Sequence, residues 1–124
     1  MATDPELLDH VLDLFAGLGR LQTGRMFSGT ALYVSGDVMF AAILGGTVWM
    51  KSDPTTEAAF LAAGSRPFSY ARKSGEREAR SLMSLPESAM DDPEEALSWA
   101  RMSLPPAEAA AEAKRRDKAR KAGR

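Results

Sequence analysis

The sequence predicts an α+β fold: an antiparallel sheet with helices packed on it, in the order helix, four strands, helix, two strands, helix. Apolar residues recur at helical spacing near the start of the chain and again after residue 92. Between these stretches, short apolar runs alternate with turns that contain Gly, Ser and Pro, which is typical of antiparallel hairpins. The 124 residues suffice for one domain, and 44% apolar with 27% charged residues is an ordinary globular composition.

The first helix is expected from about residue 4 to residue 18. Thr3 and Glu6 have the spacing of a capping box, and Pro5 suits a first helical turn. Gly19 provides a stop. The apolar side chains between these signals recur every three or four residues: Leu7, Leu8, Val11, Leu12, Leu14, Phe15 and Leu18.

Four strands follow, predicted near residues 21–27, 30–34, 38–44 and 47–51 and joined by hairpin turns. The third strand is apolar on both faces, and simple alternation divides its side chains into two sets: Val38, Phe40, Ala42 and Leu44 on one face, and Met39, Ala41 and Ile43 on the other. A strand of this kind needs a cover on each side. We therefore expect helices over one face, and a further helix or another subunit over the second.

The second half of the chain is predicted to return to the sheet. Asp53 with the following proline marks the start of a helix that continues through Ala62. A short strand is expected at Pro67–Tyr70, an exposed hairpin loop at residues 71–79, and a returning strand at residues 81–85.

The last helix is expected to begin at Asp92 and to end at Pro105-Pro106, because neither proline can donate to a helical ladder. This places the domain at residues 1–104. Residues 105–124 then form a helical tail that frays in solution, since it has no large apolar side chain to dock.

The charge of the chain is unevenly distributed. From residue 113 onward there are seven basic side chains and one acidic side chain, a balance of +6, whereas residues 1–112 carry −7. An acidic body is a poor match for the phosphates of nucleic acid, so any such contact would come through the tail. The candidates are Lys114, Arg115, Arg116, Lys118, Arg120 and Lys121. The alternative is that these residues form a solvated helix end.

No arrangement of residues points to catalysis. The chain has no cysteine, and its one histidine, His10, lies on the polar side of the first predicted helix. We therefore assign no catalytic, cofactor-binding or metal-binding residues and expect a protein that is not an enzyme. The acidic start of the chain and an apolar stretch that Gly45-Gly46 interrupts lead us to expect a cytoplasmic protein without a membrane contact.

A set of apolar and charged residues near the predicted strand ends is the best candidate for an interaction surface. Each apolar member is also explained as a core residue, and each charged member as a polar strand end. The set comprises Arg25, Met26, Phe27, Lys51, Asp53, Phe68 and Tyr70. A protein partner, which includes a second copy of the chain, is the occupant we expect.

Read in order, several short motifs resemble the TfoX N-terminal domain family, the group of competence regulators. The resemblance extends to about residue 104 and is carried by Leu18-Gly19, Arg25-Met26-Phe27-Ser28-Gly29, Tyr33, Gly36, Met39-Phe40-Ala41, Gly46, Trp49-Met50-Lys51-Ser52-Asp53, Gly64, Pro67-Phe68-Ser69-Tyr70, Met83-Ser84-Leu85-Pro86 and Trp99-Ala100.

This resemblance implies a secretion-chaperone-like arrangement of helices on an antiparallel sheet, without catalytic residues. It also implies a regulatory role in the transcription of DNA-uptake genes, through contact with a transcriptional activator or with the transcription machinery. Regulators of the family carry a second, C-terminal domain, and here Pro105-Pro106 and the basic tail stand in its place. Two alternatives remain open: a nucleic-acid binder that uses the tail, and a small-ligand-binding domain.

Overall fold

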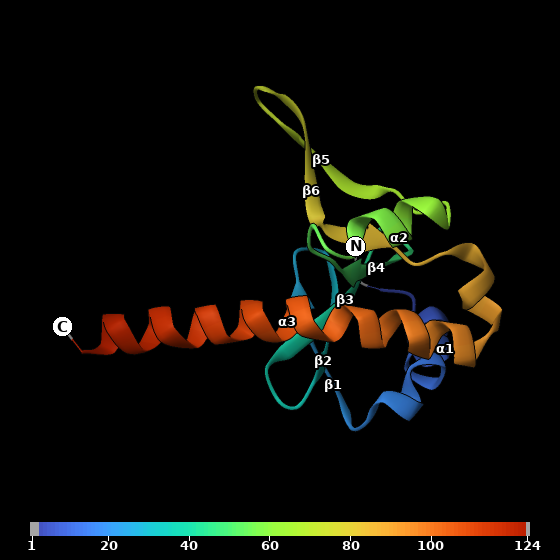
Figure 1. Ribbon diagram of the computed structural model, residues 1–124, viewed down its shortest axis with the longest axis horizontal. Helices are drawn as coiled ribbons and strands as arrows, with labels where there is room; N and C mark the ends of the chain where they lie inside the picture. Colours follow the sequence, from blue (N-terminus) through green and yellow to red (C-terminus); the bar gives the residue numbers. More distant parts are fainter. Residues whose placement is uncertain (1–2, 124) are drawn as a thin grey trace.

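The computed structural model describes residues 3–123 and has the predicted α+β architecture (Figure 1). The helices are α1 (Pro5–Leu14), α2 (Glu57–Ala62) and α3 (Pro93–Ala122), with short 3₁₀ turns η1 (Ala16–Leu18) and η2 (Glu87–Asp91). The strands are β1 (Leu21–Met26), β2 (Gly29–Val34), β3 (Val38–Leu44), β4 (Thr47–Lys51), β5 (Pro67–Arg72) and β6 (Gly75–Ser84). The predicted order of elements is confirmed.

All six strands form one antiparallel sheet with the order β1-β2-β3-β4-β6-β5. The three-residue turn Ser35-Gly36-Asp37 separates β2 from β3, and the two-residue turn Gly45-Gly46 separates β3 from β4. Positive φ angles occur at Ser35, Gly36, Gly45 and Gly46. Glycine adopts this conformation without steric cost, so these turns fix where the central strands begin and end. The predicted strand positions in this part of the chain are accordingly confirmed to within one residue.

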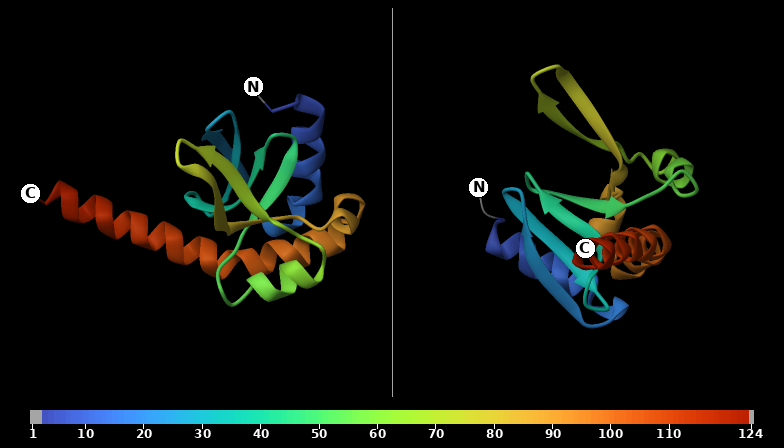
Figure 2. Two further views of the ribbon diagram at one scale, coloured as in Figure 1. Left: turned by 90° about the horizontal axis from the view of Figure 1, so that it is seen from above. Right: turned by 90° about the vertical axis from the view of Figure 1, so that its left-hand side faces the viewer.

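One face of the sheet is covered by helices. Figure 2 shows α3 lying along this face, which we call the closed face. Its main cluster includes Phe40 of β3, Met50 of β4 and Met83 of β6, all fully buried. From the N-terminal segment, Phe15 packs edge-on against Phe40 with ring centroids 5.3 Å apart. Burial of such large side chains makes this cluster the main source of folding free energy.

Helix α3 passes through Pro105 and Pro106, so the prediction that it ends there is wrong. The two prolines leave the carbonyls of Arg101 and Met102 without helical donors. Burial offsets this cost, because Pro106 itself lies against the body of the protein together with a stripe of small residues: Ala96, Ala100, Ser103, Ala107 and Ala111. Small side chains can also hold a helix against the body of the protein, because they let the helix backbone come closer to the sheet. The packed body therefore extends past residue 104.

The prediction of which β3 side chains share a face is also wrong. A β-bulge shifts the register, so that Leu32 of β2 faces Ala41 while Tyr33 faces Met39, and Phe40 has no partner between them. Phe40 and Ala41 therefore both belong to the closed face, although they are adjacent in sequence. Alternation then resumes in the opposite phase, and two other buried β3 residues point to the second face: Ala42 and Leu44.

Four local predictions need correction. Helix α2 begins at Glu57, with Thr56 as its N-cap, and not at Asp53. The N-cap of α1 is Asp4 rather than Thr3, whose hydroxyl lies 2.7 Å from that of Thr30. Helix α1 also ends at Leu14, and the chain continues as the separate turn η1. Residues 71–79, expected as a loop, instead extend β5 and β6 into a hairpin that projects from the body (Figure 2).

Within residues 3–123, no helix is long and apolar enough to cross a membrane.

Candidate functional site

Within residues 3–123, no helix covers the centre of the second face of the sheet (Figure 2). This face is hollowed into a groove of about 690 Å³. We call it the open-face groove. It lies between the β1–β2 turn and the β5–β6 hairpin, with β3, β4 and β6 beneath it. Its lining residues are Met26, Phe27, Ser28, Met39, Leu44, Gly45, Lys51, Phe68, Tyr70, Ala79, Ser81 and Leu82.

Beneath the groove lies a small, separate hydrophobic cluster, of which Leu44 and Leu82 form the floor of the groove. The cluster consists of four buried residues, Ala42, Leu44, Trp49 and Leu82, with Met26 and Phe68 packed against them at the edges. Trp49 is held in place by its indole N–H, which donates to the Leu44 carbonyl at 3.2 Å. The floor is thus apolar and fixed, which is the property a docking surface needs for a defined binding geometry.

An aromatic row leads from this floor to the surface. The Phe68 ring meets Trp49 edge-on, with centroids 5.0 Å apart, and stacks on Tyr70 at 6.2 Å. Burial falls along the row: Trp49 is buried, Phe68 is half-buried and Tyr70 is 40% exposed. The hairpin therefore presents aromatic surface to solvent at the wall of the groove.

Phe27 forms the opposite wall and breaks two local rules at once. It is 78% exposed, and its φ angle is +51°, in the left-handed region that bulky side chains avoid. The two-residue β1–β2 turn accounts for the positive φ angle, but neither hydrophobic cluster within residues 3–123 includes the Phe27 ring. A left-handed non-glycine residue costs of the order of 1 kcal/mol and is found preferentially at functional sites.

Gly29 explains how the turn that holds Phe27 stays close to the sheet. A Cβ atom at this position would lie 2.0 Å from the Ile43 carbonyl oxygen, so only glycine allows β2 to approach β3 here. The β1–β2 turn is therefore fixed against the sheet, with Phe27 above the groove.

Lys51 is the one charged residue that lines the groove. Burial lowers the pKa of Lys51, and the nearby ammonium group of Lys114 in α3 lowers it further. Among residues 3–123, no carboxylate forms an ion pair with Lys51. The groove thus ends at a half-buried cation that is repelled by the charge of a second cation, Lys114.

The β5–β6 hairpin sorts its charges between its two faces. Arg77 lies opposite Tyr70 in the register and shares its face, on the groove side. Glu78 and Arg80 occupy the alternate face, where Arg80 pairs with Glu57 of α2 and with Glu78 at 3.3 Å. The carboxylates of the hairpin therefore lie away from the groove.

Five of the seven predicted interaction residues line this groove: Met26, Phe27, Lys51, Phe68 and Tyr70. The other two do not. Arg25 alternates with Met26 and points to the opposite face, next to Thr30. Asp53 accepts the Thr55 hydroxyl at 2.6 Å and the backbone N–H of Thr56 at 3.1 Å, which positions the turn before α2. The hydrogen bond from the Thr55 hydroxyl is the main reason that the pKa of Asp53 lies below its usual value.

The basic residues predicted to contact nucleic acid all lie on the last part of α3, which extends beyond the sheet (Figure 1). Arg115 pairs with Asp37 of the β2–β3 turn at 2.8 Å and ties this part of the helix to the body. Arg120 and Lys121 both pair with Asp117, at 2.7 and 3.3 Å. The remaining three are exposed: Lys114, Arg116 and Lys118.

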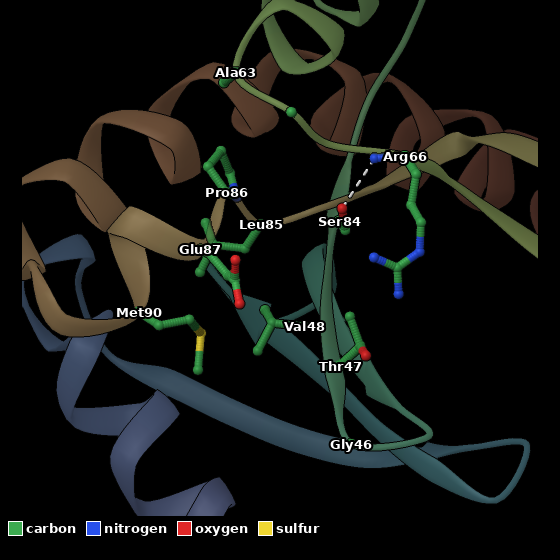
Figure 3. A pocket seen from close by; sticks show the side chains of 11 residues that line it. Gly46, Thr47, Val48, Ala63, Arg66, Ser84, Leu85, Pro86, Glu87 and Met90 are labelled. Atoms are coloured by element: carbon green, nitrogen blue, oxygen red, sulfur yellow. Dashed lines mark hydrogen bonds between the residues drawn. The ribbon is translucent and has the colours of Figure 1, made fainter.

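A second hollow of about 530 Å³ lies between β4, β6 and η2 (Figure 3). Its framework is stabilised by the Arg66 backbone N–H, which donates to the Ser84 hydroxyl at 3.0 Å. The Arg66 guanidinium also lies 5.4 Å from the centroid of the Trp49 ring. The two charged side chains of its lining, Arg66 and Glu87, have opposite signs. These residues include no histidine or second carboxylate that could serve as a base–nucleophile pair.

The residues that the structure describes also hold no candidate metal site. In the part of the chain that the structure describes, no three His, Asp or Glu side chains are grouped to hold an ion. His10 Nε2 lies 2.7 Å from the Met90 carbonyl oxygen, and this contact joins α1 to η2. The histidine therefore has a structural contact.

Sequence reasoning missed seven groove residues: Ser28 and Gly45 in turns, and Met39, Leu44, Ala79, Ser81 and Leu82 on strands. The bulge at Phe40 and a second register shift between Pro67 and Phe68 determine which face the strand side chains occupy. The one available signal was the apolar character of β3 on both faces, which indicated that something must lie against its second side.

A family model described as the TfoX N-terminal domain matches residues 13–107, about three quarters of the chain. The match ends within α3, beyond the two prolines and close to the last buried residues of that helix. No curated protein gives a significant match to the chain.

Proposed function

This chain belongs to the TfoX N-terminal domain family, and on that premise we propose that it is a non-enzymatic regulatory domain that acts by binding a protein through the open-face groove. The regulatory part rests on the role that the family resemblance implies, contact with a transcriptional activator or with the transcription machinery in the cytoplasm. The protein-binding part rests on the groove.

The observation that carries the proposal is the state of Phe27. A large apolar side chain that is 78% exposed in a left-handed backbone conformation lowers the stability of the free domain. A partner that covers this ring would recover its apolar area, which is worth about 1.5–3 kcal/mol for a side chain of this size. With Tyr70 on the opposite wall, the groove has two aromatic anchors of the kind that dominate protein interfaces.

The shape of the groove favours a protein over a small molecule. It is bounded by two hairpins and open above, and its anchors Phe27 and Tyr70 point into solvent. Small-ligand sites usually enclose most of the ligand surface. Here the two aromatic anchors stay exposed on opposite walls, so a small molecule between them would keep much of its surface in water.

The test is a cross-linked pull-down from native lysate, quantified by mass spectrometry. It compares the wild-type chain with the double variant Phe27→Gly, Tyr70→Ala and with the control Leu61→Ala. Leu61 is a suitable control because it is a large apolar residue, 45% exposed, on α2 and outside the groove lining.

Proteins that wild type and Leu61→Ala enrich equally, and that the double variant loses while keeping its circular dichroism spectrum, would support the proposal. An activator or RNA polymerase among them would support the regulatory part. Enrichment that is the same for all three proteins would refute binding through the groove.

A further inference from the structure

We propose that the segment bound in the open-face groove is an acidic one: a peptide stretch of a partner protein with apolar anchors and with carboxylates that contact Lys51, Arg77 and the first basic residues beyond the docked part of α3. This inference rests on the proposed function and specifies the chemistry of the partner.

The strongest indication is the state of Lys51. Its ammonium group is half-buried, its pKa is lowered, and Lys114 is its charged neighbour. Among residues 3–123 it has no carboxylate partner. A carboxylate delivered into the groove would offset both the desolvation and the repulsion by its attraction to the ammonium group, so an anion at this end gains more here than at an ordinary surface lysine.

The charges around the groove have one sign although the body as a whole is acidic. Residues 1–112 carry −7, yet the lining contains Lys51 and no acidic residue, and the hairpin turns Arg77 toward the groove and Glu78 away from it. Strand alternation fixes this distribution, so it is a stable property of the fold. Such local complementarity selects acidic partners and repels basic ones.

The end of the groove at Lys51 interacts electrostatically with the most basic part of the molecule. Lys114, whose charge acts on Lys51, lies in the segment from residue 113 onward that carries +6. The ion pair between Arg115 and Asp37 holds this segment of α3 to the β2–β3 turn. An acidic run that continues from the anchored stretch would therefore meet further cations along the helix.

A peptide fits these features better than nucleic acid. Most of the groove is aliphatic or aromatic surface around a single lysine, whereas a nucleic-acid strand needs cations along the whole path of its backbone. A second copy of this chain is a weaker candidate, because the acidic α1 already buries Val11 and Leu14 within its own core.

The experiment is a selection of random peptides displayed on phage against the full chain, with parallel selections on Phe27→Gly, on Lys51→Glu with Lys114→Glu, and on Leu61→Ala. The enriched peptides are then synthesised, and their affinities are measured by fluorescence anisotropy at low and high salt. Sedimentation velocity measures whether the chain forms a dimer. Fluorescence anisotropy with a labelled single-stranded oligonucleotide measures whether it binds nucleic acid.

We expect peptides with aromatic or aliphatic anchors and an excess of Asp and Glu. Their affinity should fall about tenfold with Phe27→Gly and about fivefold with the double lysine variant, remain unchanged with Leu61→Ala, and weaken with salt.

Groove-dependent peptides that are neutral or basic would overturn the acidic partner and leave the proposed function standing. Failure to enrich any peptide whose binding depends on Phe27 would count against both. A dimer that Phe27→Gly dissociates would assign the groove to a second copy. Oligonucleotide binding that Phe27→Gly weakens would assign it to nucleic acid. Either result would overturn the proposal.

Discussion

The two faces of the sheet differ in how they use large side chains. On the closed face, Phe15, Phe40 and Met50 are fully buried, and α3 packs against the sheet mainly through buried alanines and a serine. On the open face, Phe27 and Tyr70 are exposed although the floor beneath them is as apolar as a core. The closed face provides the stability of the domain, and the open face retains apolar surface that only a partner can cover.

The largest expected effect is on the closed face. Phe40→Ala removes a fully buried ring from the contact with Phe15 and should destabilise the domain by about 3–5 kcal/mol. Urea unfolding measures this. For contrast, Tyr70→Ala removes a similar ring from the open face and should change stability by less than about 0.5–1 kcal/mol. Equal losses for the two variants would contradict the division between the faces.

A smaller loss is expected at the junction of the faces. Gly29→Ala would place a Cβ atom against the Ile43 carbonyl, so the β1–β2 turn must shift, at a cost of about 1–3 kcal/mol. Because this turn positions Phe27, partner binding should weaken as well. Gln22→Ala, at an exposed position of β1 outside the groove lining, is the control and should leave both thermal stability and binding unchanged.

Phe27→Gly should separate stability from binding. Glycine accepts the left-handed φ without strain, so the variant should be as stable as wild type or more stable by up to about 1 kcal/mol, although the unfolded chain gains some entropy. Binding should nevertheless fall, because one wall of the groove is lost. A clear drop in thermal stability would instead identify Phe27 as a packing residue.

The smallest effect concerns pH. The folded-state pKa of Lys51 lies below its unfolded value, so the unfolded state binds more protons between these two values. Its contribution to stability is therefore fully present only above the unfolded pKa of about 10.4, and it is lost as pH falls through the folded pKa. Lys51→Met should remove this part of the pH dependence in urea titrations carried out below and up to the unfolded pKa of about 10.4. An unchanged profile would show that Lys51 is not perturbed by folding.

The sequence was sufficient for the order of elements, because turn residues such as Gly36 and Gly46 punctuate the central strands. The sequence also predicted five of the groove residues, because apolar and aromatic side chains and one lysine gather near the ends of the predicted strands.

Sequence patterns failed where tertiary contacts override local rules. The bulge at Phe40 reversed the face of every later β3 residue, and period-two alternation cannot reveal an added residue. Helix α3 crosses Pro105-Pro106 because Pro106, Ala107 and Ala111 are buried, a packing of small residues that a search for large apolar side chains overlooks. Asp53 was placed in the interaction set although hydrogen bonds from Thr55 and Thr56 occupy its carboxylate.

The most direct test of the central claim, that the open face is the binding surface, is to map a selected peptide on the full chain by backbone amide chemical shifts. The account predicts that the largest shifts fall on Phe27, Lys51 and Tyr70, with little change at Phe15 or along the docked part of α3. Shifts that cluster on α1, η2 or the closed face, with the groove residues unmoved, would contradict it.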